Sequence, residues 1–535
     1  MKRKHFGFFI LLVILSVGLI ACNSDSPAVD NETDAAGANN NAGNNTEELG
    51  EAGGTINVAY LAQPGTLDPH TTTANATRDP AKLIFETLLA LNENFEVTPM
   101  LAEDYEVSED GKTITFELRE GIKFHNGDEM TSEDVVASMT KWSETSFAQS
   151  NIGEHEWVAV DDHTVELHIE EASFIVLHIL AEPGQFAAIM PAGVVESAEA
   201  TGVSEYIGTG PFALENWRHD QYMHFVKFDD YQSREEPASG NAGAKEVLVD
   251  EVYYHFVPDE STRINGLLSG EYDFSHMLPY DGIPQLDADP SINVDIWPFG
   301  PQTLVFNKEG MFGDVNLRRA VNHALNKEDV LTAAFTNSEF YEAGPSLFME
   351  DQVDWFTNAG EELYDTNDMD RAQEYLDAAG YDGEEVVILT SRDYPHHYNS
   401  AVATQQALEN LGMNTKLDVY DWATLLDRRA DKDAYDIFYT GFTVMATPHQ
   451  YTFLDSRTEW PGWTNNPAFD ELLDEIKLAQ DQEEAKEIYE ELQQELWEDL
   501  PVINVGKSLR VSAYGDHVKG YTDFMGPNFW NVTVE

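Results

Sequence analysis

One stretch, residues 101–142, constrains the fold of this chain more than any other, and it reads LAEDYEVSEDGKTITFELREGIKFHNGDEMTSEDVVASMTKW. Apolar and polar residues alternate over residues 113–118, and Asp110-Gly111 supplies a hairpin turn, so two antiparallel strands are expected. Thr131 or Ser132 can then cap a helix with one apolar face, formed by Val135, Val136, Met139 and Trp142. The stretch therefore predicts a hairpin, a turn and a helix, which together make a module of an α+β lobe.

Length and charge limit the classes of protein that this chain can belong to. A chain of 535 residues is too long for one hydrophobic core, so two or three domains are expected. Its 97 Asp and Glu residues against 30 Lys and Arg give a formal net charge of -67, which repels nucleic acid phosphates and excludes nucleic acid binding. The acidic residues are spread along the chain, which indicates a halophilic-like acidic surface suited to a saline or alkaline exterior.

The first 53 residues predict export followed by a tether. A positive segment at residues 2–4 precedes an apolar run at residues 6–20, which is too short to span a membrane comfortably, so residues 1–22 read as a signal peptide. Residues 23–53 contain almost no large apolar side chain and cannot repay the entropy of folding, so we expect a disordered acidic tether. Cys22, at the junction, is the only cysteine in the chain.

No motif in the chain carries recognisable catalytic chemistry. There is no P-loop, no Gly-x-Ser-x-Gly, no His-Glu-x-x-His and no dinucleotide-binding fingerprint. Carboxylate pairs carry no information among 97 acidic residues, and His163 and His168 lack converging carboxylates at metal-ligand spacing. We therefore expect no enzyme, no cofactor and no metal site, with a secreted lipid-anchored hydrolase as the remote alternative.

Three blocks of sequence together resemble one known family. They are residues 101–142, residues 206–212 (YIGTGPF) and residues 314–325 (DVNLRRAVNHAL). These blocks resemble the signature regions of the family 5 extracellular solute-binding proteins, the receptors of peptide and nickel ABC importers. The opening at residues 53–69, with Gly-Gly-Thr, a strand and Leu-Asp-Pro, is similar to the start of mature proteins of that family, and weaker agreement continues to Val534.

The resemblance implies an α/β fold, the type II (cluster C) periplasmic-binding-protein-like two-lobed clamshell with an extra small α+β subdomain. The implied boundaries place lobe I in residues 54–85, 207–295 and 505–535, its small subdomain in residues 86–206, and lobe II in residues 296–504. Crossing strands are expected to join the lobes, which close on a ligand by hinge motion.

Periodicity adds local detail to this fold. Residues 386–390, 400–411 and 416–419 read as strand, helix and strand, a βαβ pattern. Residues 470–496 read as one long acidic helix. In residues 206–212 glycine is expected because only glycine adopts the backbone angles of a tight lobe crossing freely.

The resemblance also implies a location and partners. The sequence Leu-Ile-Ala-Cys, residues 19–22, resembles the lipobox of bacterial lipoproteins, in which the cysteine is acylated. A monomer is therefore expected outside the cytoplasmic membrane or in the periplasmic space, anchored by lipid on Cys22. Its implied partners are the transmembrane subunits of an ABC permease and a peptide or small-molecule ligand.

Carrying the family's pocket onto this chain residue by residue implies a set of ligand contacts. They are Thr72, Thr73, Asn75, Arg392, Trp422, Arg429, Gly441, Phe442, Thr443 and Met445. Trp422 and Arg429 have the seven-residue spacing of oligopeptide binders, and Arg392 resembles the arginine that receives a ligand carboxylate in dipeptide receptors. Peptide binders of this type also place an Asp for the ligand amine after the Gly-aromatic pair, but residues 443–448 contain no acidic residue.

That departure leaves the ligand open. An ammonium group in a closed cleft is costly without a compensating charge, which counts against a free-amine peptide bound in the usual way. Peptide is the leading expectation; the alternatives are a nickel chelate, to which the His396-His397 pair points, and other small polar solutes such as oligosaccharides or opines.

Overall fold

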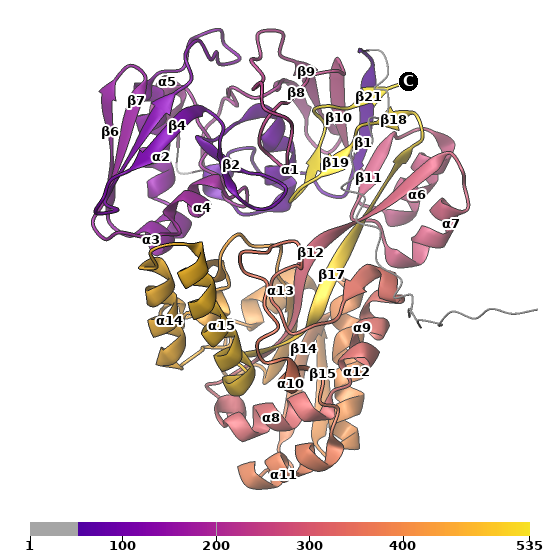
Figure 1. Cartoon of the computed structure of the whole chain (residues 1–535). Helices are drawn as coiled ribbons and strands as arrows, with labels where there is room; N and C mark the ends of the chain where they lie inside the picture. Colours follow the sequence, from indigo (N-terminus) through magenta and orange to yellow (C-terminus); the bar gives the residue numbers. More distant parts are fainter. Residues whose placement is uncertain (1–51, 200) are drawn as a thin grey trace, which may run out of the picture. The chain divides into compact units, whose positions relative to one another are not determined.

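In residues 52–199 and 201–535, which are those that the computed structural model describes, eleven strands form one mixed sheet. The order is β15-β14-β16-β12-β17-β11-β1-β10-β9-β8, with β13 (Tyr341–Glu342) paired to β17 outside this path. Figure 1 shows this sheet with helices packed around it.

Two long antiparallel strands, β12 (Ile292–Phe306) and β17 (Val502–Gly515), lie at the centre of the sheet. We call them the crossing strands. Their pairing runs from Ile292 opposite Gly515 to Val305 opposite Val502, and it shifts register at Pro298/Gly300 and at Gln302/Thr303. Because each bulge adds a residue to one strand and bends it, the sheet changes direction where the crossing strands leave its first half.

The first half of the sheet lies on the β11 side of the crossing strands. Its strands are β1 (Thr55–Tyr60), β8 (Phe212–Arg218), β9 (Tyr222–Lys227), β10 (Glu251–Phe256) and β11 (Phe274–His276). Its helices are α1 (Asn75–Ile84), α6 (Glu260–Ser269) and α7 (Ile283–Asp287). Three short pairs form separate two-stranded sheets: β2 (Leu89–Leu91) with β3 (Val97–Pro99), β18 (Val518–Lys519) with β21 (Thr533–Val534), and β19 (Thr522–Asp523) with β20 (Pro527–Asn528).

A separate four-stranded antiparallel sheet contains the first part of residues 101–142, and we call residues 102–206, which include this sheet, the small-sheet region. The sheet comprises β4 (Ala102–Val107), β5 (Thr113–Leu118), β7 (Thr164–Ile169) and β6 (His155–Asp161). The helix α2 (Ser132–Ser143) begins at a capping box between Thr131 and Asp134, and it buries Val135, Met139 and Trp142. The predicted hairpin, turn and helix are confirmed. The neighbouring helices are α3 (Ser146–Ile152), α4 (Val176–Ala181) and α5 (Ala192–Glu196).

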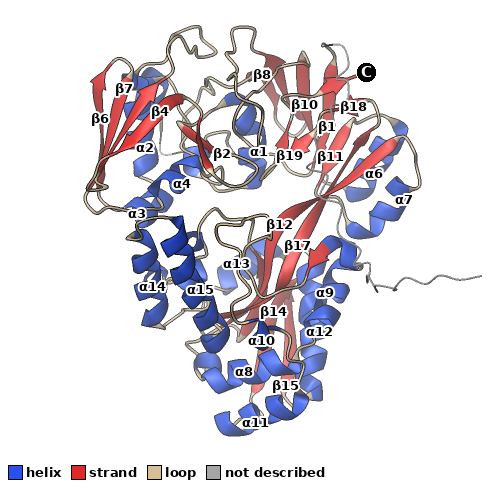
Figure 2. Ribbon diagram, in the orientation of Figure 1, coloured by secondary structure: helices blue, strands red, loops and turns tan. Residues whose placement is uncertain are grey.

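The second half of the sheet is formed by three parallel strands, β14 (Glu385–Ser391), β15 (Asn414–Tyr420) and β16 (Ile437–Gly441). The helix α12 (Pro395–Asn410) connects β14 to β15, which confirms the predicted βαβ unit, and α13 (Trp422–Arg428) connects β15 to β16. Figure 2 shows the helices that surround these strands. Besides α12 and α13 they are α8 (Val315–Ala324), α9 (Lys327–Phe335), α10 (Glu361–Tyr364), α11 (Met369–Ala379), α14 (Pro467–Lys477) and α15 (Gln482–Asp499).

The single long helix predicted over residues 470–496 is wrong, because two helices occupy this region. α14 ends at Lys477, and α15 begins after Asp481, whose side chain accepts a hydrogen bond from the amide of Glu484. An aspartate at the N-cap position favours the start of a new helix, so the chain turns between α14 and α15.

The reason expected for the glycines of residues 206–212 is also wrong. Neither Gly208 nor Gly210 has a positive φ. A Cβ on Gly210 would lie 2.6 Å from the carbonyl oxygen of Leu83, and one on Gly208 would collide with the carbonyl oxygen of Ile84. The two glycines are required because the segment before β8 approaches the last turn of α1 too closely for any side chain.

Candidate ligand-binding site

Three parallel strands end at one edge of the second half of the sheet, and several predicted site residues follow those ends. β14 pairs in parallel with both β15 and β16. Arg392 comes directly after β14, Trp422 comes two residues after β15, and Gly441 is the last residue of β16. Open α/β sheets bind ligands outside the carboxyl ends of their strands, so this carboxyl edge is the candidate site.

Four rings pack together at this edge, and we call them the aromatic cluster: Tyr394, His396, His397 and Trp422. The Trp422 ring stacks on His397 with centroids 5.5 Å apart and meets Tyr394 at 4.7 Å in a T-shaped contact. The rings of His396 and His397 are 4.2 Å apart. His397 is buried, whereas Tyr394 is 39% exposed, so the cluster has an internal side and a side that a ligand can reach.

Both histidines of the cluster are neutral at pH 7. Burial lowers the pKa of His396 to about 4, and burial together with His396 holds the pKa of His397 well below its usual value. The side-chain amide of Gln302, in β12, donates a 2.9 Å hydrogen bond to Nδ1 of His397, which leaves the proton of this neutral ring on Nε2. The pair therefore brings no positive charge to the site.

Arg392 lies beside the aromatic cluster and is exposed. Its guanidinium stacks 4.8 Å from the centre of the Tyr398 ring and donates a 3.1 Å hydrogen bond to the Tyr398 hydroxyl. Among residues 52–199 and 201–535 no carboxylate forms an ion pair with it. A guanidinium held in place by an aromatic ring can bind a ligand carboxylate without first breaking an ion pair with another acid.

Arg429 lies on the other face of the sheet. The Tyr439 hydroxyl shares a 2.7 Å hydrogen bond with Thr404 of α12, so α12 covers the Tyr439 face of β16. Side chains alternate along a strand, so Phe438, which precedes Tyr439, faces away from α12. The Arg429 guanidinium lies 6.0 Å from the centre of the Phe438 ring and is therefore on that opposite face. Trp422 and Arg429 thus lie at opposite ends of α13, and their seven-residue spacing does not bring them together.

The guanidinium of Arg429 is half-buried between two aromatic rings. It lies 6.0 Å from the centre of Phe438 and 5.9 Å from that of Trp460. Burial lowers the pKa of Arg429, which the nearby Tyr435 opposes. In the described part of the chain no carboxylate or carbonyl group pairs with this guanidinium. A half-buried charge without an anionic partner marks a place where an anionic group would bind favourably.

Phe442 connects the two groups of predicted residues. It follows Gly441 at the carboxyl edge, and its ring lies 5.7 Å from Trp460, the same ring that faces Arg429. It also packs against Phe453 at 5.1 Å. Gly441 itself lies against the aromatic cluster, since a Cβ there would be 3.8 Å from Cε1 of His397.

The loop after β16 contains Thr443 and Met445, both half-buried. Oγ1 of Thr443 lies 4.0 Å from Sδ of Met445. The side-chain amide of Gln352 donates a 2.7 Å hydrogen bond to the Met445 carbonyl, and Oε1 of Gln450 accepts the amide of Ala446 at 2.7 Å. The loop is thus held by amide side chains, and residues 443–448 contain no acidic residue.

The predicted contacts at residues 72–75 lie in the first half of the sheet. They join the 3-10 turn η1 (Pro69–Thr71) to α1. Oγ1 of Thr72 accepts the amide of Ala74 at 3.1 Å, and the Tyr60 hydroxyl donates to the Asn75 carbonyl at 3.1 Å, while Thr73 is exposed. No hydrogen bond within the described ranges joins this segment to the carboxyl edge, so its part in binding stays a prediction.

The Leu-Asp-Pro-His sequence before this segment has a structural role. The buried Asp68 carboxylate accepts the amides of His70 at 3.0 Å and Val203 at 2.9 Å, and it pairs with Lys141 of α2 at 2.8 Å. One carboxylate thereby ties the turn after β1 to two segments of the small-sheet region.

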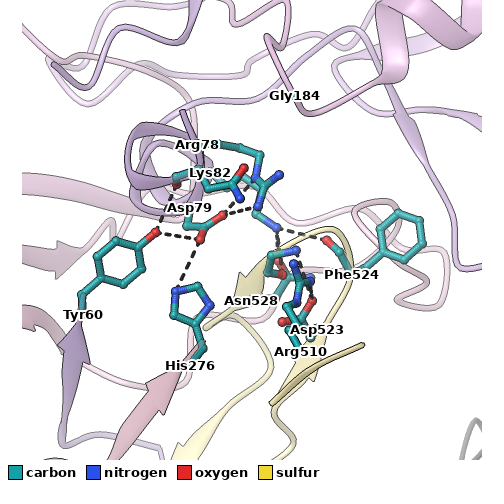
Figure 3. Close-up of polar contacts among 12 residues, drawn as sticks. Tyr60, Arg78, Asp79, Lys82, Gly184, His276, Arg510, Asp523, Phe524 and Asn528 are labelled. Atoms are coloured by element: carbon teal, nitrogen blue, oxygen red, sulfur yellow. Dashed lines mark hydrogen bonds and ion pairs between the residues drawn. The ribbon is translucent and has the colours of Figure 1, made fainter. Parts of the chain in front are cut away.

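A second polar group, which the sequence analysis did not predict, is buried in the first half (Figure 3). We call it the buried charge network, and it contains Tyr60, Arg78, Asp79, Lys82, His276, Arg510, Asp523 and Asn528. Asp79 accepts hydrogen bonds from Tyr60 at 2.8 Å and from Nε of Arg78 at 2.9 Å. Nζ of Lys82 donates to Oδ1 of Asn528 at 2.7 Å and to the carbonyl of Gly526 at 3.1 Å.

The buried charge network attaches α1 to the C-terminal segment. Lys82 and Asn528 are 446 positions apart, so no local pattern could have revealed their contact. Burial lowers the pKa of Lys82 to about 7, and burial lowers that of His276 to about 4. The charged groups of the network pair with one another, Arg78 with Asp79 and Arg510 with Asp523, which indicates a structural role.

Two contacts join the small-sheet region to the second half of the sheet. The amide of Phe174 donates a 2.8 Å hydrogen bond to the carbonyl of Lys477, at the end of α14. Glu182 is buried, which raises the pKa of its carboxyl, and hydrogen bonds from Gly184 and from the Gln450 side chain oppose this shift. Segments far apart in sequence are thus in contact in this conformation.

Two kinds of feature are absent from the described residues. No group of three or more His, Cys, Asp or Glu side chains there could hold a metal ion. No helix of residues 52–199 or 201–535 is both long and apolar enough to cross a bilayer. Cys22 and the predicted signal peptide lie outside the described residues.

Two relatives are similar to this chain over most of its length. A probable peptide ABC transporter periplasmic-binding protein, y4tO, from Sinorhizobium fredii is 28% identical over 506 residues, which cover 89% of this chain and 93% of the relative. The glutathione-binding protein GsiB of Escherichia coli K12 is 26% identical over 489 residues, covering 87% of this chain and 91% of GsiB.

Solved structures share the fold. AgaA from Agrobacterium tumefaciens R10, in complex with agropinic acid, is 26% identical with a TM-score of 0.74 over 90% of this chain and 99% of AgaA. The dipeptide-binding protein from Pseudoalteromonas sp. SM9913, in complex with Met-Leu, is 23% identical with a TM-score of 0.76 over 90% of this chain and all of that one. NikA from Staphylococcus aureus, in complex with Ni(L-His)2, is 17% identical with a TM-score of 0.73 over 90% and 100%.

The sequence profile described as Bacterial extracellular solute-binding proteins, family 5 Middle, matches residues 96–465. The expected α/β fold, that of the type II periplasmic binding proteins with a large mixed sheet, is confirmed by these structural neighbours. The chain therefore belongs to the bacterial extracellular solute-binding proteins of family 5, and it is a solute-binding receptor and not an enzyme.

Proposed function

We propose that this chain is the substrate-binding receptor of an ABC importer and that it captures peptides at the carboxyl edge of β14, β15 and β16. The observation that carries the proposal is the convergence of Arg392, Trp422 and Gly441 at that edge around the aromatic cluster. Rings that a ligand can reach, with one exposed guanidinium beside them, suit a solute that is partly apolar and carries a carboxylate.

The relatives support peptide as the class of ligand. One is named for peptide, another for glutathione, and a structural neighbour holds the dipeptide Met-Leu. Each of these ligands combines a carboxylate with backbone amides. The site residues of the chain fit that combination through Arg392 and through strand-end backbone groups.

The crossing strands offer the hinge for closure on a ligand. Gly300, at a register shift in β12, has a φ of 135°, and Gly506, in β17, has a φ of 149°. Both angles favour glycine, so these are points where two long strands can change direction without side-chain strain. In our proposal, residues 296–504 close against residues 54–295 and 505–535 about these points, and the contact between Phe174 and Lys477 belongs to the closed state.

We further propose that Cys22 is acylated and anchors the receptor to the outer face of the cell membrane. The sequence Leu-Ile-Ala-Cys after an apolar run supports this. Residues 23–53 then act as the tether, and a monomer hands its ligand to the transmembrane subunits of the permease.

A thermal-shift experiment on the full chain tests the proposed function. Peptides, nickel with histidine, opines and oligosaccharides are added separately. A ligand at about 100 times its Kd stabilises the folded state by about 2.7 kcal/mol, which is a readily measured rise in melting temperature. A rise with peptides supports the proposal, and a rise with oligosaccharides alone contradicts it.

Two other ligands have a specific observation in their favour. A nickel chelate is favoured by the His396 and His397 rings, which are 4.2 Å apart, and by the fold shared with NikA. Nδ1 of His397 is already occupied by Gln302, so Nε2 and His396 would have to supply the ligands. An opine is favoured by AgaA, and like a peptide it would present a carboxylate to Arg392.

A further inference from the structure

We propose that Asp393 receives the ammonium group of the ligand and so replaces the acid that is missing from the loop after β16. This inference rests on the proposed function, and it names the class of solute: peptides or related solutes with a free, protonated amine. It assigns to Asp393 a role that none of the residues predicted from the sequence can fill.

The carboxylate of Asp393 is held between two strand ends. Asp393 comes two residues after β14, and its Oδ2 accepts a 2.7 Å hydrogen bond from the amide of Trp422, which follows β15. Its own amide donates to Oγ of Ser391 at 3.2 Å. The first hydrogen bond fixes the side chain, and the second holds the backbone of Asp393, at the carboxyl edge where Arg392 and Gly441 lie.

One oxygen of this carboxylate remains available. In the described part of the chain, Oδ1 of Asp393 accepts no hydrogen bond, and no Lys, Arg or His forms an ion pair with the group. Its basic neighbour in sequence, Arg392, is turned onto Tyr398. The carboxylate therefore has a fixed direction and an unused acceptor, which is what an incoming N–H donor requires.

The other acids near this edge are already engaged. Asp421 caps α13 by accepting the amide and the hydroxyl of Thr424 at 3.0 and 2.8 Å. Asp418 is paired with Lys416 at 2.9 Å and with Arg428 at 3.7 Å. Residues 441–450 contain no acid at all. Asp393 is thus the carboxylate that can take an additional cation.

The rings around Asp393 favour the same ligand group. Tyr394 and Trp422 flank it, and their rings meet at 4.7 Å. The two histidines of the aromatic cluster are neutral, so they do not repel a cation. An ammonium group on Asp393 would therefore have a carboxylate as hydrogen-bond acceptor and no protonated histidine beside it.

The test compares free-amine and N-acetylated peptides on the full chain purified in detergent. Probes are one equimolar mixture of tripeptides and tetrapeptides and the same mixture after N-acetylation, with bound peptides identified by mass spectrometry and affinities measured by calorimetry. We expect the wild type to retain free-amine peptides and to bind their acetylated forms about tenfold to a hundredfold more weakly, the range of a lost charge-assisted hydrogen bond.

Two variants make the assignment specific. Asp393→Asn keeps an acceptor for the Trp422 amide but removes the charge, and we expect it to bind free-amine peptides at least about tenfold more weakly. Glu385→Gln, at the exposed opposite end of β14, removes the same charge away from the site and should bind like the wild type. Equal melting temperatures of the three proteins show that the fold is retained.

The outcomes separate this inference from the function on which it rests. If the wild type binds peptides but Asp393→Asn binds them equally well, or if acetylation has no effect, Asp393 is not the amine site and the peptide receptor stands. If the wild type binds neither peptide mixture, the proposed peptide function itself is wrong, and the assignment of Asp393 to a peptide amine is overturned with it.

Discussion

The guanidinium of Arg429 lies 5.9 Å from the centre of the Trp460 ring, and no acid among the described residues compensates its charge. We expect Arg429→Ala to weaken about tenfold the binding of an anionic ligand that extends from the carboxyl edge past Phe442 to Trp460, because the ligand loses a charge-assisted contact. Calorimetry on the full chain measures this change.

Arg428 provides the matched control for Arg429. It is the preceding residue, but it stacks on Tyr420 at 4.5 Å and pairs with Asp418 at 3.7 Å. Arg428→Ala removes the same charge without touching Trp460, so its affinity should equal that of the wild type. Unchanged affinity in Arg429→Ala would remove Arg429 from the site.

A second prediction concerns Gly208. Its missing Cβ leaves room for the carbonyl oxygen of Ile84, at the end of α1. Gly208→Ala forces the segment before β8 and the end of α1 apart, and overpacking of this kind costs about 1–3 kcal/mol. We expect a lower melting temperature. Gly193→Ala is the control, because a Cβ there has nothing within 4 Å; a Gly208→Ala variant as stable as Gly193→Ala would contradict the close approach.

A third prediction concerns Lys82 in the buried charge network. Lys82→Met leaves the side-chain carbonyl of Asn528 and the carbonyl of Gly526 without their donor, and each unsatisfied buried acceptor costs about 1–3 kcal/mol. The variant should therefore unfold at a lower temperature. A melting temperature equal to that of the wild type would show that desolvation of the ammonium group offsets these hydrogen bonds.

The same residue gives a pH dependence of defined sign. Burial lowers the pKa of Lys82 to about 7, below that of the unfolded chain. Between pH 7 and the usual lysine pKa of about 10.4 the unfolded chain binds more protons at this site, so its contribution to stability rises with pH. The difference in melting temperature between wild type and Lys82→Met should be larger at pH 9 than at pH 6.5, and the opposite trend would contradict the assignment.

A fourth prediction concerns salt. Ten Lys and Arg residues are buried in the described part of the chain, but only five Asp and Glu are. The surface is therefore more acidic than the net charge of -67 already suggests. We expect the melting temperature to rise from low salt to about 1 M NaCl, where the Debye length falls to about 3 Å and repulsion is screened. The rise should shrink at pH 4, where carboxylates become protonated; a rise of equal size there would indicate a general salt effect.

A fifth prediction concerns the anchor. Replacing Cys22 by Ser removes the thiol that would carry the lipid, so labelled palmitate should no longer be incorporated and the protein should leave the membrane fraction. Wild-type protein without label would show that this cysteine is not acylated.

Local chemistry in the sequence was sufficient for much of the fold. In residues 101–142 alternation, a turn and a capping residue agree with one another, and the structure has the hairpin and helix α2 there. The βαβ unit of residues 385–420 was predictable for the same reason. Over residues 470–496 a continuous acidic, amphipathic pattern concealed the new helix start at Asp481, because a cap depends on one side chain and not on periodicity.

The sequence by itself determined the fold class, the receptor family and the strand ends at which Arg392, Trp422 and Gly441 lie, because these depend on local patterns and on motifs. Only the tertiary structure decided which of these residues meet. After β15 the chain crosses β14 to reach β16 on its other side. This crossing places α13 on the face opposite α12 and moves Arg429 away from Trp422. The tertiary structure also placed Asp393 against Trp422 and Lys82 against Asn528. Residues far apart in sequence are brought together by strand order and handedness, which one sequence does not specify.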